Sequence, residues 1–250
     1  MGRWSRVVAR EFLAWLGCAD GLRWLDVGCG TGVLSAVVTE RCGPRVVVGC
    51  DRSEGFVGAA ARTTAPASGA PRFVVADATA LPARAGAFDV AVSGLTLNFL
   101  PEPADGVREL ARVVRPGGLV AAYVWDYGDG MGFLRRFWDA ATAVDPDAAA
   151  LDEGRRFPDC RPEPLHRLWT GAGLTAVSTT AIEVPTVFTG FADLWNPFLS
   201  GQGPAPGYVA SLTPTTRNRL RDTLHAILPT APDGSIPLTA RAWAVRGVRG

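Results

Sequence analysis

The sequence predicts an α/β fold built on a doubly wound, seven-stranded, mostly parallel sheet, with a helix before the sheet and a helical cap before its last strand. From residue 23 onward, short β-rich runs alternate with helical patterns, which requires crossover connections between parallel strands. A glycine-rich turn at residues 28–32 lies where the first strand would meet the next helix, the usual place of a ligand crevice in such sheets. The 250 residues, 48% of them hydrophobic, suffice for one domain with its own core, so we expect a single domain over residues 1–250.

The elements of the first half follow in order. Apolar residues at helical spacing from Val7 to Leu16 predict an amphipathic helix that ends before Gly17, with residues 2–6 before it free to fold over a neighbouring group. The Arg-Pro-Gly-Gly run at residues 115–118 predicts a stop between a helix and the fifth strand. The expected strands span residues 23–27, 45–50, 72–76, 88–93 and 119–124, and the expected helices lie near residues 31–41, 53–62 and 104–114.

The second half has a looser pattern. Residues 186–230 are dense in proline, glycine and aromatic residues, and because long structureless loops are rare in compact domains, they predict a helical cap. We therefore expect a cofactor-binding core at about residues 20–125 and substrate-side segments at about residues 126–172 and 186–230. The many aromatic residues there fit either the core of a cap or a pocket for a flat, lipophilic small molecule. The remaining expected elements are helices at residues 130–141 and 165–172, a loop at 158–164, and strands at 174–184 and 239–248.

Composition excludes several classes of function. The chain has no lysine, which removes Schiff-base, pyridoxal phosphate and P-loop chemistry. Its formal charge of +1 gives no basic face for nucleic acid. Five cysteines without a C-x-x-C pair predict neither a disulfide framework nor a metal site. No apolar stretch approaches the roughly 20 residues of a membrane span, and no signal peptide is apparent, so we expect a cytoplasmic protein without membrane insertion.

The glycine-rich turn carries the chemical information. Its pattern is G-x-G-x-G, whereas a dinucleotide-binding turn needs a third glycine at the position held by Val33. Asp26 precedes the first glycine by two residues. A carboxylate there disfavours a pyrophosphate and favours a ligand that bears an ammonium group and a sulfonium.

The run Leu25 to Gly32 resembles the glycine-rich loop of class I S-adenosylmethionine-dependent methyltransferases, which have a Rossmann-like fold. Further similar segments follow in the family's order at residues 50–51, 77–78, 88–93 and 110–118, so the resemblance spans about residues 23–125. Within the family the chain is most similar to the type 11, ubiquinone-biosynthesis-like branch that acts on small molecules. The resemblance implies S-adenosyl-L-methionine as the cofactor.

The resemblance also implies individual roles. Asp51 corresponds to the acid that accepts hydrogen bonds from the ribose hydroxyls, and Asp77 and Ala78 correspond to the loop that binds adenine. The N-terminal segment corresponds to one that closes over the methionine end of the cofactor. The implied cofactor-binding residues are Trp4, Arg6, Asp26, Gly28, Gly30, Gly32, Asp51, Arg52, Asp77, Ala78 and Ser93.

The expected reaction is metal-independent methyl transfer to an oxygen, nitrogen or carbon atom of a small, aromatic or lipophilic acceptor. Alignment and exclusion of water suffice for such a displacement, with or without a general base. No residue is a certain catalyst, and the acceptor-side candidates are Asn98, Asp126, Tyr127 and His166.

Three alternatives stay open. A methyltransferase for RNA, DNA or protein is disfavoured because residues 93–96 lack the Asn/Asp-Pro-Pro-aromatic motif of enzymes that methylate exocyclic amines. An NAD(P)-dependent oxidoreductase is disfavoured by Asp26 and by the missing third glycine. A non-catalytic S-adenosylmethionine-binding protein is not excluded by any residue.

Overall fold

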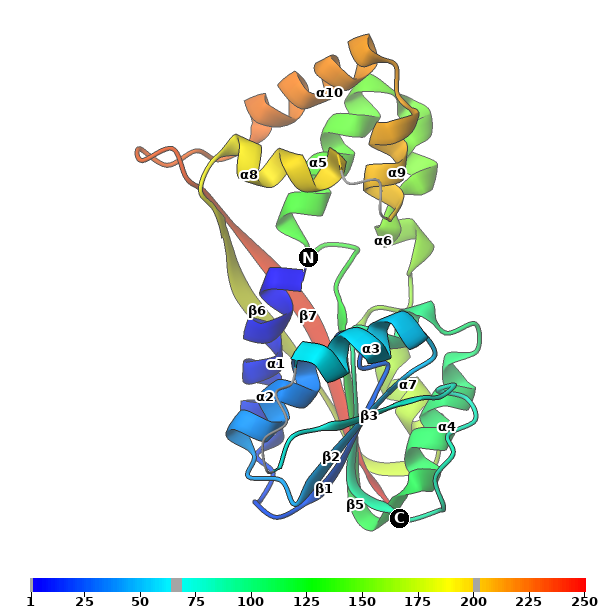
Figure 1. Cartoon of the computed structure of the whole chain (residues 1–250). Helices are drawn as coiled ribbons and strands as arrows, with labels where there is room; N and C mark the ends of the chain where they lie inside the picture. The colour runs from blue at the N-terminus through cyan, green and yellow to red at the C-terminus, as the bar shows by residue number, and fades with distance from the viewer. Residues whose placement is uncertain (1, 64–68, 200–202) are drawn as a thin grey trace. The chain divides into compact units, whose positions relative to one another are not determined.

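The computed structural model of the chain describes residues 2–63, 69–199 and 203–250. They contain a seven-stranded sheet with the order β3-β2-β1-β4-β5-β7-β6, and its β1–β2, β1–β4, β2–β3 and β4–β5 pairs are parallel (Figure 1). The chain adds β2 and β3 on one side of β1 and then crosses to β4 on the other side, which makes the carboxyl ends of β1 and β4 a topological switch point. The predicted fold class is confirmed.

The strands lie close to the predicted ranges. They are β1 (Arg23–Val27), β2 (Val46–Asp51), β3 (Arg72–Val75), β4 (Phe88–Gly94), β5 (Val114–Trp125), β6 (Leu174–Phe188) and β7 (Ile236–Arg249). The helices that accompany the first five strands are α1 (Gly2–Leu16), α2 (Val33–Arg41), α3 (Glu54–Thr63), the 3-10 turn η1 (Leu97–Phe99) and α4 (Pro103–Val113).

The chain forms two compact units. The first comprises the described residues of 1–124, 161–182 and 242–250, and the second those of 125–160 and 183–241. This division differs from the expected segments, because α7 (Pro162–Gly171) belongs to the first unit. The reason is Trp169, which is completely buried and donates a hydrogen bond from its indole nitrogen to the carbonyl oxygen of Val120 in β5, at 3.0 Å.

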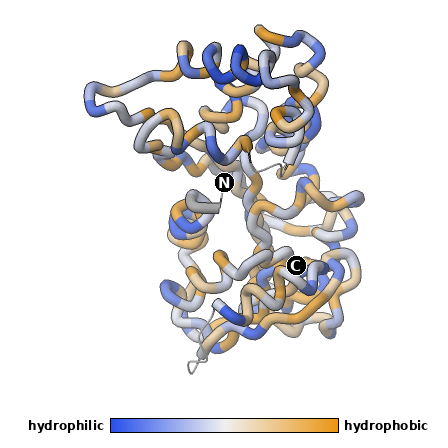
Figure 2. The backbone as a smooth tube through the Cα atoms, turned by 45° about the horizontal axis from the view of Figure 1, so that its top comes forward, coloured by the Kyte–Doolittle hydropathy of each residue, from blue (hydrophilic) through white to orange (hydrophobic). Residues whose placement is uncertain are grey.

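Helices cover both faces of the sheet in the first unit. Helices α1 and α2 pack together on one face, and α4 and α7 lie on the opposite face (Figure 1). Phe12 of α1 is fully buried, with its ring centroid 4.7 Å from that of Tyr123 in β5. Hydrophobic and hydrophilic residues alternate along the helices, as amphipathic helices with one buried face require (Figure 2).

Three local details differ from the sequence predictions, one of which is that residues 162–164, expected in a loop, form the start of α7. Residues 2–6, expected as a free segment, are the first turn of α1. Residues 115–118, expected to precede the fifth strand, lie within β5 as an irregularity, where the β4–β5 register passes from Phe88–Val114 directly to Val90–Leu119. Gly117, with a φ of 73°, supplies the left-handed backbone conformation that this excursion needs.

The second unit is mainly helical. Its described helices are α5 (Gly132–Val144), η2 (Pro146–Leu151), α6 (Glu153–Arg156), α8 (Phe191–Trp195), η3 (Asn196–Leu199), α9 (Pro204–Ser211) and α10 (Pro214–Ile227). Phe137 is completely buried and stacks on Phe198 with 4.3 Å between ring centroids, and Trp138 and Tyr208 pack beside them. These aromatic residues therefore form the core of the unit.

None of the helices among the described residues has both the length and the apolar character that a membrane span needs.

Candidate functional site

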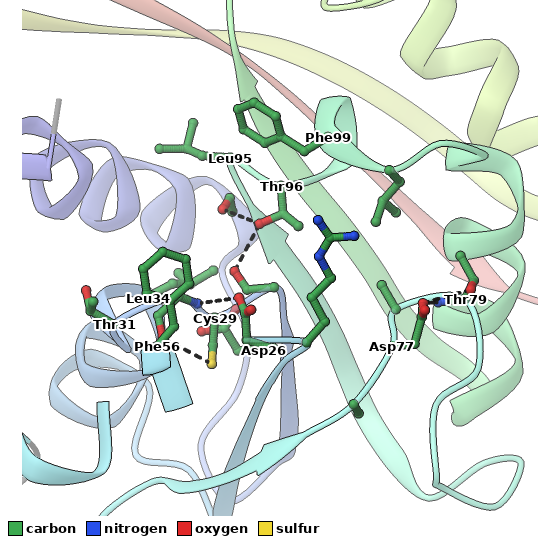
Figure 3. A pocket seen from close by; sticks show the side chains of 18 of the residues that line it. Asp26, Cys29, Thr31, Leu34, Phe56, Asp77, Thr79, Leu95, Thr96 and Phe99 are labelled. Atoms are coloured by element: carbon green, nitrogen blue, oxygen red, sulfur yellow. Dashed lines mark hydrogen bonds between the residues drawn. The ribbon is translucent and has the colours of Figure 1, made fainter. Parts of the chain in front are cut away.

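A cavity of about 620 Å³ opens at the carboxyl ends of β1, β2, β3 and β4, and its described lining residues belong to the first unit. Figure 3 shows Asp26 and Cys29 on one side of it, Asp77 and Thr79 on the opposite side, and Leu95, Thr96 and Phe99 on a third. The volume is typical of small-molecule sites, and the position is the one expected for a doubly wound sheet.

The glycine turn is fixed by the loop after β4. Gly28 has a φ of 73°, and a Cβ atom there would lie 2.2 Å from the Thr96 methyl carbon. The Thr96 hydroxyl donates a hydrogen bond to the Gly28 carbonyl oxygen at 2.9 Å. Gly28 is therefore required by both backbone conformation and space. Gly30 also lines the cavity, whereas Gly32 packs against Phe73 behind the turn.

Asp51, at the end of β2, lines the cavity and also holds the glycine turn. Its Oδ2 accepts a hydrogen bond from the Gly30 amide at 3.0 Å, and its Oδ1 accepts one from the Ser53 amide at 2.9 Å. The sequence predicted a ligand contact at this position but not the bond to Gly30, because nothing in the local pattern reveals a contact between residues 21 positions apart.

Asp26 is a buried acid with one unsatisfied oxygen. Its side chain is almost completely buried, and its Oδ2 accepts a hydrogen bond from the Ser35 hydroxyl at 2.6 Å. Its Oδ1 has no hydrogen-bond partner in the described part of the chain. Burial raises the pKa of Asp26 to about 6, and the nearby charge of Asp51 adds to this effect. A cationic group in the cavity would favour its ionised form.

The loop after β3 forms the opposite side of the cavity. Asp77 accepts hydrogen bonds from the amide and the hydroxyl of Thr79 at 2.8 and 2.7 Å, which lower the pKa of Asp77, and the Arg52 charge lowers it further. Ala78 and Arg52 also line the cavity. Asp77, Ala78 and Arg52 thus all line the cavity, and the adenine-binding role of Asp77 and Ala78 stays a prediction.

Acidic side chains outnumber basic ones around the cavity. Only Arg52 contributes a positive charge among the described lining residues. The carboxylates that line it belong to Asp26, Asp51, Asp77, Glu102 and Asp105. The cavity therefore favours a ligand that carries positive charge.

Some predicted cofactor residues lie off the cavity wall. Because residues 2–6 are helical, Ser5 faces the cavity, whereas Trp4 and Arg6 are not among the lining residues, and Arg6 pairs with Glu40 of α2. Ser93 is buried beside the lining residue Gly94, and its hydroxyl has no partner in the described structure. Their roles in binding stay predictions.

The four acceptor-side candidates are not brought together on the cavity wall. Asn98 has a buried side-chain amide without a hydrogen-bond partner among the described residues. Asp126 belongs to the second unit, where two guanidinium nitrogens of Arg241 lie 2.8 and 2.6 Å from its Oδ2. The ring centroid of Tyr127 lies 5.1 Å from that of Phe157. His166 lies on α7 beside a separate shallow hollow. Any part that these four take in the reaction stays a prediction.

The sequence reasoning missed several residues that line the cavity, among them Phe56, Leu95, Phe99 and Tyr123. Leu95 has a φ of 60°, a backbone conformation that is unfavourable for a leucine and that often marks a functional site. A single sequence carries no signal for such a φ value. Tyr123 could have been found, because the side-chain alternation along β5 places it on the same face of the sheet as Asp26.

Comparison with known proteins agrees with this geometry. Residues 25–122 match the family model described as a methyltransferase domain. The 2-methyl-6-phytyl-1,4-hydroquinone methyltransferase of Synechocystis is 36% identical over 119 residues, which are 48% of this chain and 37% of that protein. A tRNA (carboxymethyluridine(34)-5-O)-methyltransferase of Xenopus tropicalis is 37% identical over 118 residues, which are 46% of this chain and 17% of that protein. The similarity to these relatives is thus confined to part of each of them.

The fold similarity extends further. A phosphoethanolamine N-methyltransferase 2 of Haemonchus contortus, solved in complex with S-adenosyl-L-methionine, superposes with a TM-score of 0.61 at 14% identity, over 97% of this chain and 52% of that one. At that identity the match concerns the fold alone. Residues 25–122 of this chain thus match the methyltransferase domain model, and the chain has the fold of a solved methyltransferase.

Proposed function

We propose that this protein is an S-adenosylmethionine-dependent methyltransferase that acts on a small-molecule acceptor. The observation that carries the proposal is the cavity at the glycine turn, which has room for such a cofactor and an acidic lining suited to a cation. The unsatisfied Asp26 Oδ1 at its wall fits a ligand with a hydrogen-bond donor and a positive charge.

The residues of the cavity divide the binding between them. Asp51 accepts hydrogen bonds from the ribose, Asp77 and Ala78 bind the adenine, and the glycine turn permits close approach of the ligand to the backbone. When bound, the cofactor supplies an electrophilic methyl group on a cationic sulfur. The protein then chiefly aligns the acceptor and excludes water, so a dedicated base is optional.

A small-molecule acceptor is supported by the acidic lining and by the name of the Synechocystis relative, a hydroquinone methyltransferase. A polyanion would be repelled by the carboxylates around the cavity, since like charges at close range are unfavourable. The second candidate is methylation of RNA, which the tRNA-modifying relative from Xenopus tropicalis favours.

Methyl-labelled cofactor tests both candidates. We expect purified protein to transfer label to members of a panel of phenols, amines and quinols and to leave bulk tRNA unlabelled. Label on tRNA alone would establish the RNA activity instead, and cofactor binding without any transfer across a wide panel would indicate a non-catalytic binder. Binding of a nicotinamide dinucleotide in place of S-adenosylmethionine and S-adenosylhomocysteine would refute the proposal.

Asp51→Ala should remove measurable S-adenosylhomocysteine binding in calorimetry. Each hydrogen bond between a charged group and its partner contributes about 1.5–3 kcal/mol, so the loss of two weakens binding by orders of magnitude. Because Asp51 also bonds to Gly30 and Ser53, circular dichroism and a melting curve must show that the variant folds. Glu54→Ala, which removes an exposed acid of α3, is the matched control and should bind normally. Near-normal affinity of the Asp51 variant would contradict the ribose assignment.

A further inference from the structure

Two arginines near the end of β7 bind the ends of the two helices that border the cavity. Arg246 and Arg249 are three positions apart, and because side chains alternate along a strand, they leave opposite faces of the sheet. Helix α1 lies on one of these faces and α4 on the other (Figure 1). Each arginine donates hydrogen bonds to the carboxyl-terminal end of one helix.

Arg246 holds the end of α1 through several contacts. Its Nη1 donates hydrogen bonds to the carbonyl oxygens of Trp15 at 3.1 Å and Leu16 at 3.4 Å. Its guanidinium carbon lies 4.7 Å from the centroid of the Trp15 ring, and its Nε donates to the Ser178 hydroxyl of β6 at 3.2 Å. The last turn of α1 has no basic residue of its own, so Arg246 supplies the positive charge that stabilises the carboxyl end of a helix.

Arg249 holds the end of α4 in a similar way. Its Nη1 donates to the carbonyl oxygen of Arg112 at 2.9 Å and also to that of Val114. Arg112 is basic and lies in the last turn of α4, but its guanidinium donates to the carbonyl oxygens of Leu81 and Ala83 after β3, at 2.9 and 2.7 Å. The cation that binds the last carbonyl groups of this helix therefore also comes from β7.

The opposite ends of both helices line the cavity. Ser5 contributes from the first turn of α1, and Glu102 and Asp105 contribute from the start of α4. Since an α-helix rises about 1.5 Å per residue, the stretch from Ser5 to Leu16 is roughly 17 Å long. A tilt of about 5° at Leu16 would displace Ser5 by about 1.5 Å. The cavity wall is thus sensitive to how firmly β7 holds the far ends of these helices.

The cavity-side ends of the helices have weaker polar restraints. Arg6 of α1 pairs with Glu40 of α2, and 42% and 45% of the two side chains are exposed. Asp105 of α4 pairs with Arg108, and both side chains are exposed to a similar or greater extent. Exposed ion pairs contribute little, because water screens the charges and both side chains lose freedom. The contacts from β7 are therefore the stronger polar restraints on the two helices.

We propose that Arg246 and Arg249 are positioning residues of the cofactor cavity. They hold α1 and α4 by their carboxyl ends and so keep the cavity walls at the amino ends of these helices in place. Neither arginine is among the described lining residues, so each acts on binding only through the helix that it holds. This inference rests on the proposed function, because its test uses S-adenosylhomocysteine as the probe.

Arg246→Gln should weaken S-adenosylhomocysteine binding in calorimetry by about threefold to tenfold, the range that corresponds to the loss of one or two hydrogen bonds. Hydrogen exchange should become faster in residues 4–8 of α1 and stay unchanged in residues 103–107 of α4. Arg249→Gln should weaken binding similarly and have the converse effect on exchange. Each variant is the matched control for the other, because a general loosening of the protein would raise exchange in both helices.

Two further variants separate positioning from stability. Arg246→Lys keeps the positive charge but donates fewer hydrogen bonds, so its affinity should lie between those of the wild-type protein and Arg246→Gln. It also carries the test if the glutamine variant does not fold. Ile182→Val removes one methyl group from a buried residue of β6 in the same unit. This variant should lower the melting temperature but leave S-adenosylhomocysteine affinity and exchange in both helices unchanged.

The outcomes distinguish this inference from the proposed function. If both glutamine variants bind S-adenosylhomocysteine as tightly as the wild-type protein, or if each raises exchange in α1 and α4 alike, the positioning role is wrong and the proposed function stands. A loss of affinity in Ile182→Val as large as that in Arg246→Gln would also overturn the positioning role. If the wild-type protein binds neither S-adenosylmethionine nor S-adenosylhomocysteine, the proposed function itself fails.

Discussion

At the scale of single residues, Asp26 both lines the cavity and affects the stability of the fold through its raised pKa. The sequence predicts its importance, because a carboxylate before the glycine turn selects against a pyrophosphate. It does not predict the hydrogen bond from Ser35 or the unsatisfied oxygen, both of which depend on how α2 packs against the sheet. The result is an acid that ionises in the folded protein only at a raised pKa, of about 6.

This pKa gives a pH dependence of stability. The unfolded chain ionises Asp26 near its usual pKa of 3.8, whereas the folded protein retains the proton up to a pH of about 6. The stabilisation from this group is therefore fully present below the unfolded pKa and is lost as the pH rises through about 6. A shift of about two units corresponds to roughly 3 kcal/mol.

We expect ligand-free Asp26→Asn to be more stable than the wild-type protein by up to about 3 kcal/mol at pH 8, because the asparagine never ionises. The difference should decrease steadily towards pH 4. Urea unfolding at several pH values measures it, with Asp159→Asn, at an exposed position of the second unit, as the matched control. A difference that does not change with pH would contradict the expected ionisation of Asp26.

At the scale of elements, the loops after β1 and β4 depend on one another. The sequence predicts both loops from strand ends and glycines. It does not predict that the Thr96 side chain occupies the space beside Gly28, since 68 positions separate the two residues and only the sheet order brings them together.

Gly28→Ala should destabilise the protein more than Gly30→Ala. Both glycines have a positive φ, which costs an alanine about 1–2 kcal/mol, but a Cβ atom at Gly28 also overlaps Thr96, whereas nothing lies within 4 Å at Gly30. We expect the overlap to cost a further 1–3 kcal/mol, approximately, in the free energy of unfolding measured by urea titration. Equal losses in the two variants would show that the Thr96 contact is unimportant.

The irregularity in β5 shows a similar limit of sequence analysis. The Pro-Gly-Gly run correctly indicates a break, but the chain resumes the same strand after it instead of starting a new one. The excursion is fixed by Asp89, whose carboxylate accepts hydrogen bonds from Arg23 at 2.9 and 3.0 Å and from Arg115 at 2.7 Å. These arginines lower the pKa of Asp89 well below its usual range. Such a link between three separate segments has no local sequence pattern.

At the scale of the whole molecule, the main cavity and the aromatic core belong to different units. The described lining residues of the main cavity belong to the first unit, whereas the rings of Phe137 and Phe198 stack within the second. The sequence allowed these rings to form either a core or a pocket, and their burial identifies a core. Composition alone could not distinguish the two, because both need clustered aromatic residues.

Phe137→Ala should therefore lower stability without changing cofactor affinity. Removal of a fully buried phenylalanine typically costs about 3–5 kcal/mol. Thermal unfolding should show this loss, while calorimetry at a temperature where the variant is folded should give the wild-type dissociation constant for S-adenosylhomocysteine. Val74→Ala, at an exposed position of β3, is the control and should change neither quantity appreciably. Weaker binding by the Phe137 variant would show that the second unit contributes to the cofactor site.

The acidic lining of the cavity also bears on turnover under the proposed function. Donation of the methyl group converts a positively charged sulfur into a neutral thioether. The charge attraction between this sulfur and the carboxylates that line the cavity is then lost. These carboxylates belong to Asp26, Asp51, Asp77, Glu102 and Asp105. S-adenosylhomocysteine is consequently bound less strongly by charge than S-adenosylmethionine. Its departure is favoured by the same residues that attracted its precursor.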